Sequence, residues 1–246
     1  MRPKAIPARV WVTRTEPGAW ATARRLEAAG YTPIVAPLLR AERLPVPDSA
    51  LAPLPAALIL TSPHGVEALH ARLAPGHPAR RLRVYAVGEA TAAAARAAGF
   101  DPVLSADGDR EALAQTIETD PERPDGALLF AGADIPAGDL PARLAPSGIL
   151  VRHLALYATR PCPVVLPAAC RSQLKAVLLQ SPRAARVLAD AVRALETTLP
   201  SECALICLSD AVATPLRDVF GSERIAIAAT PTETDLMVAL TAALSA

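Results

Sequence analysis

The sequence predicts an α/β protein that contains two doubly wound, mainly parallel sheets of five strands each. Short apolar runs alternate with longer helical stretches along the chain, a pattern typical of parallel sheets covered by helices on both faces. Ten such runs are present, enough for two five-stranded sheets. The same order of strand, polar turn and helix also occurs twice, which indicates a duplicated domain.

The expected strands follow one another with helices between them. The clearest of these helices is the alanine-rich stretch after Gly88, with Thr91 in its first turn. The strands are expected at Val10–Arg14, Pro33–Ala36, Ala57–Ser62, Val84–Gly88, Pro102–Ser105, Ala127–Gly132, Ile149–His153, Ala176–Ser181, Leu205–Ser209 and Ile225–Ala228.

Two pairs of segments carry the internal repeat. "LILTSPHGVEAL" (residues 58–69) resembles "VLLQSPRAARVL" (177–188), and "AVGEATAAAA" (86–95) resembles "CLSDAVATPL" (207–216). The second copy has no chain left for its last unit, but the N-terminal "VWVTRTEPG" and the residues after it supply the counterpart. One copy is therefore split around the other.

The split repeat predicts two flavodoxin-like domains. The first is discontinuous and consists of residues 1–36 and 162–246, and the second is inserted at residues 44–153. Residues 37–43 and 154–161 are the expected interdomain linkers. Because they must run side by side, we expect them to form a hinge that frames a cleft.

Composition excludes several classes of protein. The formal net charge is +1 and the basic residues are spread along the chain, so no nucleic-acid partner is expected. No uncharged apolar run approaches the roughly 20 residues of a membrane helix, so no membrane partner is expected. The N-terminal residues lack the pattern of a secretory signal, which favours a cytoplasmic location.

The sequence shows no pattern typical of a metal or nucleotide site. The histidines are dispersed and no carboxylate cluster accompanies them. Both the phosphate-binding loop and the GxGxxG pattern are absent. We therefore expect no metal and no nucleotide cofactor. The histidines are His64, His70, His77 and His153.

The four cysteines have spacings that fit neither a CxxC redox pair nor a zinc knuckle. We expect all of them to be buried, reduced thiols. They are Cys162, Cys170, Cys203 and Cys207.

Polar residues at strand ends are the candidates for binding. Ligands of open parallel sheets lie beyond the carboxyl ends of the strands, where helix N-termini present free N–H groups. Thr61, Ser62 and Ser181 stand at such ends, and each hydroxyl either caps its helix or meets an anionic group. Thr91 has two interpretations: either it supports the fold, and the apolar Val212 at the matching position of the repeat is unremarkable, or it contacts ligand, and the two faces of the cleft are unequal.

Tyr157 is one of only three tyrosines and lies in "LALYATRP", inside the second linker. Two interpretations stay open. Its ring packs against the paired linkers, or its phenol serves in the cleft as an acid or hydrogen-bond donor.

These segments together resemble the uroporphyrinogen-III synthase family. The matching motifs are "VTR", "PLLR", "LILTSPHGVEAL", "AVGEATAAAA", "LYATRP" and "TETDLMVAL". They cover nearly the whole chain, and their order and spacing carry the resemblance. It implies two doubly wound domains joined by a two-stranded ladder, similar to the arrangement predicted by the repeat.

The resemblance also implies an activity. The family cyclises hydroxymethylbilane, a linear tetrapyrrole with acetate and propionate groups, with loss of water and inversion of ring D through a spiro intermediate. Such a polyanion suits helix N-termini. The implied enzyme is a carbon–oxygen lyase (a hydro-lyase) without a cofactor, acting as a monomer, with a transient contact to hydroxymethylbilane synthase.

The resemblance assigns roles to residues of this chain. Tyr157 matches the tyrosine that helps the hydroxyl leave, and Thr91 matches a threonine of the cleft. Positions that face the cleft at strand ends complete the expected substrate site. The expected substrate-binding residues are Arg14, Thr61, Ser62, Gly88, Thr91, Gln180, Ser181 and Ser209.

The chain departs from a symmetric repeat, and from the arginine–glycine pair often found where it reads "LLFAGADIPAGDL". The alternative hypothesis is a diverged, non-catalytic two-domain cleft protein that binds an anionic small molecule. An adaptor built from response-regulator-like domains is disfavoured, because acidic residues do not gather at the strand ends. The repeat differs at Thr61 and Gln180, at Gly88 and Ser209, and at Thr91 and Val212.

Overall fold

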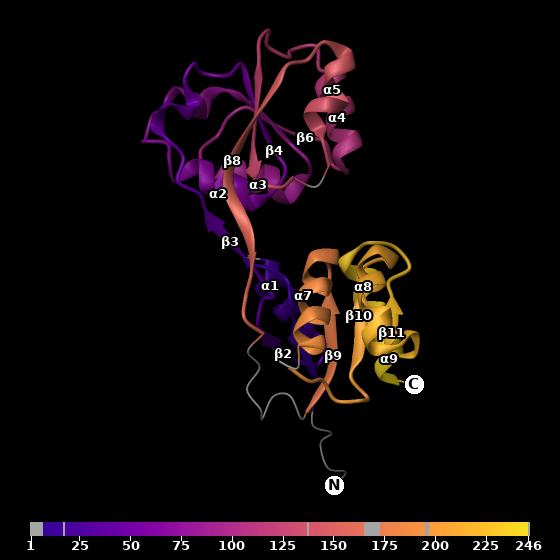
Figure 1. The fold of residues 1–246 in the computed structure, drawn as a ribbon. Helices are drawn as coiled ribbons and strands as arrows, with labels where there is room; N and C mark the ends of the chain where they lie inside the picture. Colours follow the sequence, from indigo (N-terminus) through magenta and orange to yellow (C-terminus); the bar gives the residue numbers. More distant parts are fainter. Residues whose placement is uncertain (1–6, 17, 137, 165–172, 195–196, 246) are drawn as a thin grey trace. The chain divides into compact units, whose positions relative to one another are not determined.

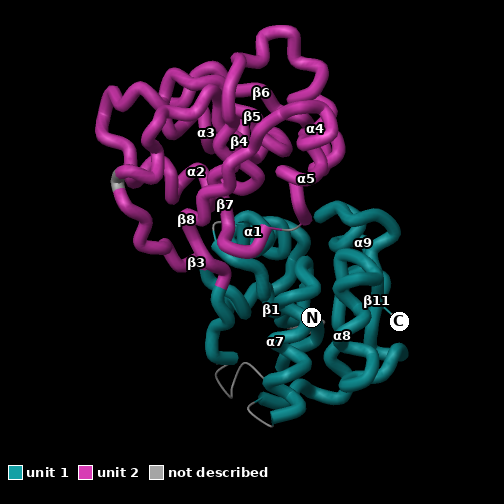
Figure 2. Tube along the Cα trace, turned by 45° about the horizontal axis from the view of Figure 1, so that its top comes forward, with its two compact units in different colours: residues 1–40, 160–246 teal, residues 41–159 magenta. Residues whose placement is uncertain are grey.

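The computed structural model of the 246-residue chain describes residues 7–16, 18–136, 138–164, 173–194 and 197–245. The chain forms two compact units (Figure 2): unit 1 consists of residues 1–40 and 160–246, and unit 2 of residues 41–159. Each unit is built on one sheet covered by helices (Figure 1). No helix in the described ranges is long and apolar enough to span a membrane.

Unit 1 contains a five-stranded sheet in the order β11-β10-β9-β1-β2, with every neighbouring pair parallel. The strands are β1 (Arg9–Val12), β2 (Thr32–Val35), β9 (Leu174–Leu179), β10 (Ala204–Cys207) and β11 (Ile225–Ile227). The helices are α1 (Gly18–Ala28), α7 (Pro182–Arg193), α8 (Asp210–Phe220) and α9 (Glu233–Ser245).

Both faces of this sheet are buried, because side chains of a strand alternate between them. Trp11 of β1 packs with Leu188 of α7 and Leu216 of α8 in one core cluster. The adjacent Val12 packs in a second cluster with Leu26 of α1 and Leu236 of α9. The apolar runs of the sequence are therefore central strands between two helical layers.

Unit 2 contains a six-stranded sheet in the order β3-β8-β7-β4-β5-β6. The strands are β3 (Leu39–Arg43), β4 (Ala57–Leu60), β5 (Arg83–Ala86), β6 (Val103–Ser105), β7 (Leu128–Ala133) and β8 (Val151–Pro161). The helices are α2 (Pro63–His70), α3 (Glu89–Ala97), α4 (Arg110–Thr119) and α5 (Leu140–Leu144). Short 3-10 helices lie at Asp48–Leu51, Pro78–Arg81, Ala145–Ser147 and Ser222–Arg224.

The sheet of unit 2 is also buried on both faces. Leu58 and Leu60 of β4 pack with Leu69 of α2 in one cluster. Ile59 packs on the opposite face with Leu113 of α4. The helices α2 and α3 thus cover one face of this sheet, and α4 and α5 the other (Figure 1).

The prediction of five strands is correct for unit 1 and wrong for unit 2, where β3 is the sixth strand. The Leu44 N–H donates to Leu156 O at 2.9 Å, and the Cys162 N–H donates to Leu38 O at 2.9 Å. Residue numbers rise along one segment as they fall along the other, so the two segments are antiparallel. The expected linkers 37–43 and 154–161 are therefore largely β-structure.

The two sheets have the same strand order when the repeated segments are matched. Strands β2-β1-β9-β10-β11 correspond to β8-β7-β4-β5-β6. When the strands are numbered in chain order, unit 1 has the flavodoxin order 2-1-3-4-5, read from β2 to β11. The matching strands of unit 2 have the order 3-2-1-4-5, read from β6 to β8. The flavodoxin-like order therefore holds for unit 1 only, and the split copy is a circular permutation of the intact one.

A buried charged cluster fastens α4 to β5. Asp120, which follows α4, accepts hydrogen bonds from Arg83 Nη2 at 3.0 Å and from the Tyr85 hydroxyl at 2.6 Å. The Asp120 side chain is 3% exposed and that of Arg83 14%. Arg83 also pairs with Glu122, whose side chain is 75% exposed. Burial opposes ionisation of Asp120, but bonds from Tyr85, the Glu122 backbone and Arg83 hold its pKa below the ordinary value.

Candidate functional site

The predicted site residues lie at the carboxyl ends of the strands, near the switch point of each sheet, which is the point where the strand order reverses. In unit 2 this point lies between β4 and β7, and Thr61 and Ser62 follow β4 directly. In unit 1 it lies between β1 and β9, with Arg14 after β1 and Gln180 and Ser181 after β9. Open α/β sheets bind their ligands at such points.

Ser62 is the N-cap residue of α2. Its Oγ accepts a hydrogen bond from the Gly65 N–H at 3.1 Å, and Pro63 is the first helical residue. A Cβ at Gly65 would lie 3.0 Å from the Ala131 carbonyl oxygen, so glycine lets the first turn of α2 approach the end of β7. The capping interpretation of Ser62 is confirmed.

Tyr157 is placed by a register shift in β8. The pairing of β7 and β8 shifts between Gly132 and Ala133, and Ala133 pairs with Tyr157, so Leu156 is the extra residue. As a result, Leu156 and Tyr157 pack into the same core cluster although they are neighbours in sequence. The Asp134 N–H donates to Tyr157 O at 2.8 Å and fixes this geometry.

The Tyr157 hydroxyl lies 2.8 Å from Ser62 Oγ. Its ring is 5.7 Å from the His64 ring, and the residue is 8% exposed. Burial raises the pKa of Tyr157, the bond to Ser62 partly offsets the rise, and the Asp134 charge adds to it. Burial also lowers the pKa of His64, with Glu67 opposing. A phenol with a raised pKa keeps its proton at neutral pH but is a weaker acid than a free tyrosine, so donation requires a group that stabilises the phenolate.

Gly88 and Thr91 lie at the start of α3, which follows β5, the neighbour of β4. Gly88 has an extended backbone, and a Cβ there would meet only the Gly108 carbonyl oxygen at 3.9 Å. Its conformation therefore does not require glycine. Thr91 is 3% exposed. A substrate contact for either residue stays a prediction.

Arg14 forms an ion pair within unit 1. Its Nη1 lies 3.2 Å from Glu233 Oε2 and 3.4 Å from Thr22 Oγ1, and Thr22 Oγ1 donates to Glu233 Oε1 at 2.5 Å. The guanidinium lies over Gly18, where a Cβ would come within 2.7 Å of it. Arg14 thus ties β1 to α1 and α9, with 37% of its side chain exposed.

The other candidates of unit 1 differ in how their polar atoms are used. Ser181 Oγ caps α7 by accepting from the Arg183 N–H at 3.2 Å. Ser209 occupies the N-cap position of α8 but makes no side-chain capping bond. Both amide atoms of Gln180 are buried, with no hydrogen-bond partner among the described residues. Buried amides usually have a partner, so Gln180 is the least satisfied candidate of this unit.

A family model described as uroporphyrinogen-III synthase HemD matches residues 21–237. The chain belongs to this family. The uroporphyrinogen-III synthetase structure from Helicobacter pylori is similar, with a TM-score of 0.63 and 20% identity over 98% of this chain and 99% of that chain. A mutant uroporphyrinogen III synthase from the extremely thermophilic bacterium Thermus thermophilus has a TM-score of 0.57 and 21% identity over 98% and 99%. No curated protein matches.

The family that the ordered motifs predicted is thus confirmed. The similarity to the two solved synthases supports the α/β fold of this chain. At identities of 20% and 21% it supports the fold alone. The family belongs to the porphyrin and haem pathway, and its substrate is the tetrapyrrole that the resemblance implied.

Two residues near Tyr157 in this synthase-family chain were missed by sequence reasoning. His64 was considered only for a metal site, which the sequence did not favour, whereas its ring contacts the Tyr157 ring. Asp134 was not considered, although it follows β7 and bonds the Tyr157 backbone. The position of each after a strand at the switch point was the available signal.

The cysteine prediction holds for two residues. Cys203 and Cys207 are buried free thiols, and burial raises the pKa of each to about 12. Cys162 is a free thiol but only half-buried, because it lies just beyond the end of β8. Cys170 lies outside the described residues. Within the described ranges no group of three potential metal ligands is found.

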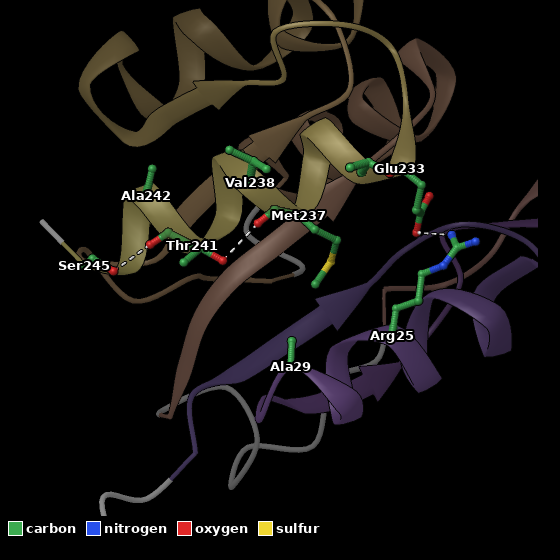
Figure 3. Close-up of a pocket in the computed structure, with 9 residues that line it drawn as sticks. Arg25, Ala29, Glu233, Met237, Val238, Thr241, Ala242 and Ser245 are labelled. Atoms are coloured by element: carbon green, nitrogen blue, oxygen red, sulfur yellow. Dashed lines mark hydrogen bonds and ion pairs between the residues drawn. The ribbon is translucent and has the colours of Figure 1, made fainter.

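A groove of about 750 Å³ lies between α1 and α9, which cover the same face of the unit 1 sheet (Figure 3). Its lining is mostly apolar, and Arg25 lies 3.7 Å from Glu233 at one end. None of the residues predicted for the family's site lines it. One end of the groove reaches Glu233, which pairs with the candidate Arg14, but because no candidate residue lines the groove we do not take it as the candidate site.

Proposed function

We propose that this chain converts hydroxymethylbilane into uroporphyrinogen III. Membership of the synthase family supports the reaction. The observation that carries the residue-level proposal is the 2.8 Å contact between Ser62 and Tyr157 at the switch point of unit 2. This pair brings a protonated phenol and a helix N-terminus to the edge where α/β sheets bind ligands.

The proposed chemistry needs a proton for the departing hydroxyl group. Tyr157 donates it, so that the carbon–oxygen bond breaks with its electron pair on oxygen and water leaves. Ring D then attacks through its substituted carbon to form the spiro intermediate, and reopening and closure invert the ring. The proton lost when the last pyrrole regains aromaticity restores the phenol. Each step is an ionic bond change, so the proposal is a hydro-lyase without a cofactor.

The substrate carboxylates are proposed to meet the helix N-termini at the strand ends. In unit 2 these are the starts of α2 and α3, with Thr61, Gly88 and Thr91. In unit 1 they are the starts of α7 and α8, with Gln180 and Ser209. Free N–H groups and the positive ends of helix dipoles bind anions without a large excess of basic residues, which agrees with the net charge of +1.

The setting of the reaction is part of the proposal. We place it in the cytoplasm, with the chain acting as a monomer that receives its unstable substrate through a transient contact with hydroxymethylbilane synthase. The domains are proposed to be residues 1–36 with 162–246 and residues 44–153, with linkers at 37–43 and 154–161. The family's place in haem biosynthesis supports the location.

The test generates hydroxymethylbilane in situ, adds the protein, oxidises the products and separates uroporphyrin isomers I and III. We expect isomer III to dominate, with and without a chelator. Isomer I at the level without protein would instead support a non-catalytic binding protein.

Tyr157→Phe separates the proposed acid from a packing role. We expect it to lower kcat about a hundredfold, the lower end of the range for general acid catalysis. The matched control is Tyr31→Phe, which removes a hydroxyl that lies 3.2 Å from Thr241 in unit 1. Wild-type turnover in Tyr157→Phe would assign Tyr157 to structure alone.

A further inference from the structure

The Ser62 hydroxyl makes two hydrogen bonds that together restrict what it does. Its oxygen accepts from the Gly65 N–H at 3.1 Å and lies 2.8 Å from the Tyr157 oxygen. A serine hydroxyl has one proton and two lone pairs. The bond from Gly65 occupies a lone pair and leaves the proton of Ser62 available for Tyr157.

The direction of the bond between Ser62 and Tyr157 depends on the charge of the phenol. A neutral tyrosine hydroxyl donates or accepts, but a phenolate only accepts. Once Tyr157 has released its proton, the bond must therefore run from the Ser62 hydroxyl to the phenolate. At 2.8 Å the two oxygens are already at hydrogen-bond distance, so no rearrangement is needed.

The helix behind Ser62 strengthens this bond. Ser62 caps α2, and the Gly65 N–H that it accepts is one of the free donors at the helix N-terminus. Donation to an oxygen polarises the O–H of the same hydroxyl, and the positive end of the helix dipole favours a negative charge nearby. The Gly65 N–H, the Ser62 hydroxyl and the Tyr157 hydroxyl thus form a short hydrogen-bond network that ends at the phenol.

The surroundings of Tyr157 hold its hydroxyl in this hydrogen-bond network. The His64 ring lies 5.7 Å from the phenol ring, tilted by 53°, and the Asp134 N–H holds the Tyr157 backbone. The charged groups nearby are Asp134, which disfavours a phenolate, and Glu67 on α2. Glu67 is itself paired with Arg43 of β3 at 2.8 Å.

We propose that Ser62 is a positioning residue that connects the Tyr157 hydroxyl to the N-terminus of α2 and stabilises the phenolate that forms when the phenol gives up its proton. Its catalytic consequence rests on the proposed function of Tyr157. Ser62 itself transfers no proton out of the pair, because its proton stays on its own oxygen and the proton of Tyr157 goes to the departing hydroxyl.

The repeat offers a matched control. Ser181 caps α7 in unit 1 as Ser62 caps α2 in unit 2, but no bond to a tyrosine is found for it among the described residues. Replacing either serine by alanine removes a cap, at a similar cost. Only Ser62→Ala removes a bond to Tyr157.

The first measurement is the ionisation of Tyr157 without substrate. The three tyrosines are replaced by 3-fluorotyrosine, which ionises at lower pH, and followed by fluorine NMR, with Tyr157→Phe identifying the signal. We expect Ser62→Ala to raise the pKa of Tyr157 by about one unit. Ser62→Thr restores the wild-type value, and Ser181→Ala leaves it unchanged. A variant that folds poorly is replaced by Ser62→Gly, since glycine is nearly as good an N-cap.

An unchanged or lowered pKa in Ser62→Ala would overturn the proposal, as would an equal shift in Ser181→Ala. The second measurement compares turnover. We expect the double variant Ser62→Ala/Tyr157→Phe to be no slower than Tyr157→Phe, because Ser62 acts through Tyr157. Multiplied losses would overturn the proposal. The NMR titration uses no substrate, so a failure of the synthase assay leaves its result standing.

Discussion

Replacing Asp120 by asparagine removes the charge that balances Arg83 inside unit 2. The Asp120 side chain is 3% exposed and that of Arg83 14%. Removing one partner of a buried ion pair costs about 3–5 kcal/mol, because it leaves the other charge buried. Arg83 keeps its pair with Glu122 at 2.9 Å, so we expect a loss near the lower end, about 3 kcal/mol.

Urea unfolding followed by far-ultraviolet circular dichroism measures the loss for Asp120→Asn. The matched control is Glu122→Gln, which breaks the exposed pair of the same arginine and costs at most about 1 kcal/mol. Both tryptophans, Trp11 and Trp20, lie in unit 1, so their fluorescence reports on that unit separately. An Asp120→Asn loss no larger than that of Glu122→Gln would refute the reasoning.

The same comparison has a pH dependence with a defined sign. The pKa of Asp120 is lowered in the folded chain, so its charged form contributes stability above the ordinary pKa of an aspartate, about 3.9. That contribution is lost as the pH falls through the lower folded value. The difference between wild type and Asp120→Asn therefore shrinks below about pH 4, and a constant difference there would contradict the assignment.

Two further predictions concern a threonine and the thiols. Thr91→Val keeps the shape of a residue that is 3% exposed, and we expect a roughly tenfold higher KM with an unchanged melting temperature; a wild-type KM would leave Thr91 a structural role. In a Cys170→Ser background, we expect Cys162 to react with a thiol reagent at pH 8, while Cys203 and Cys207, whose pKa values burial raises to about 12, react only after denaturation. Rapid reaction of three thiols would contradict the burial.

Much of the fold follows from local sequence. All ten expected strands are present, with ends displaced by a few residues or, for β8, extended to Pro161. The missed strand β3 reads LRAER, in which only Leu39 is buried. Apolar and charged residues alternate only over Leu39–Glu42, and the segment contains no β-branched or aromatic residue and no apolar run, so the local signal for a strand is weak. Pairing with β8 forms this strand.

The types of residue at the candidate site could be predicted from the sequence, but the contacts between those residues could not. Strand-end serines predicted the caps formed by Ser62 and Ser181. The bond between Ser62 and Tyr157 spans 95 residues and depends on the register shift in β8. The ion pair between Arg14 and Glu233 spans 219 residues. Contacts of this kind are fixed by how the strands pair and leave no local pattern in the sequence.

The permuted order of unit 1 has a consequence for the chain as it leaves the ribosome. Strand β1 is synthesised early but occupies an interior position in its sheet, between β2 and β9. Thr13, just after β1, bonds to Leu178, which is 165 residues further on. At roughly 5–20 residues per second, β1 waits on the order of 10–30 seconds for this partner. The apolar side chains of Val10, Trp11 and Val12 lack their partners from α7, α8 and α9 throughout that interval, while all of residues 41–159 emerge.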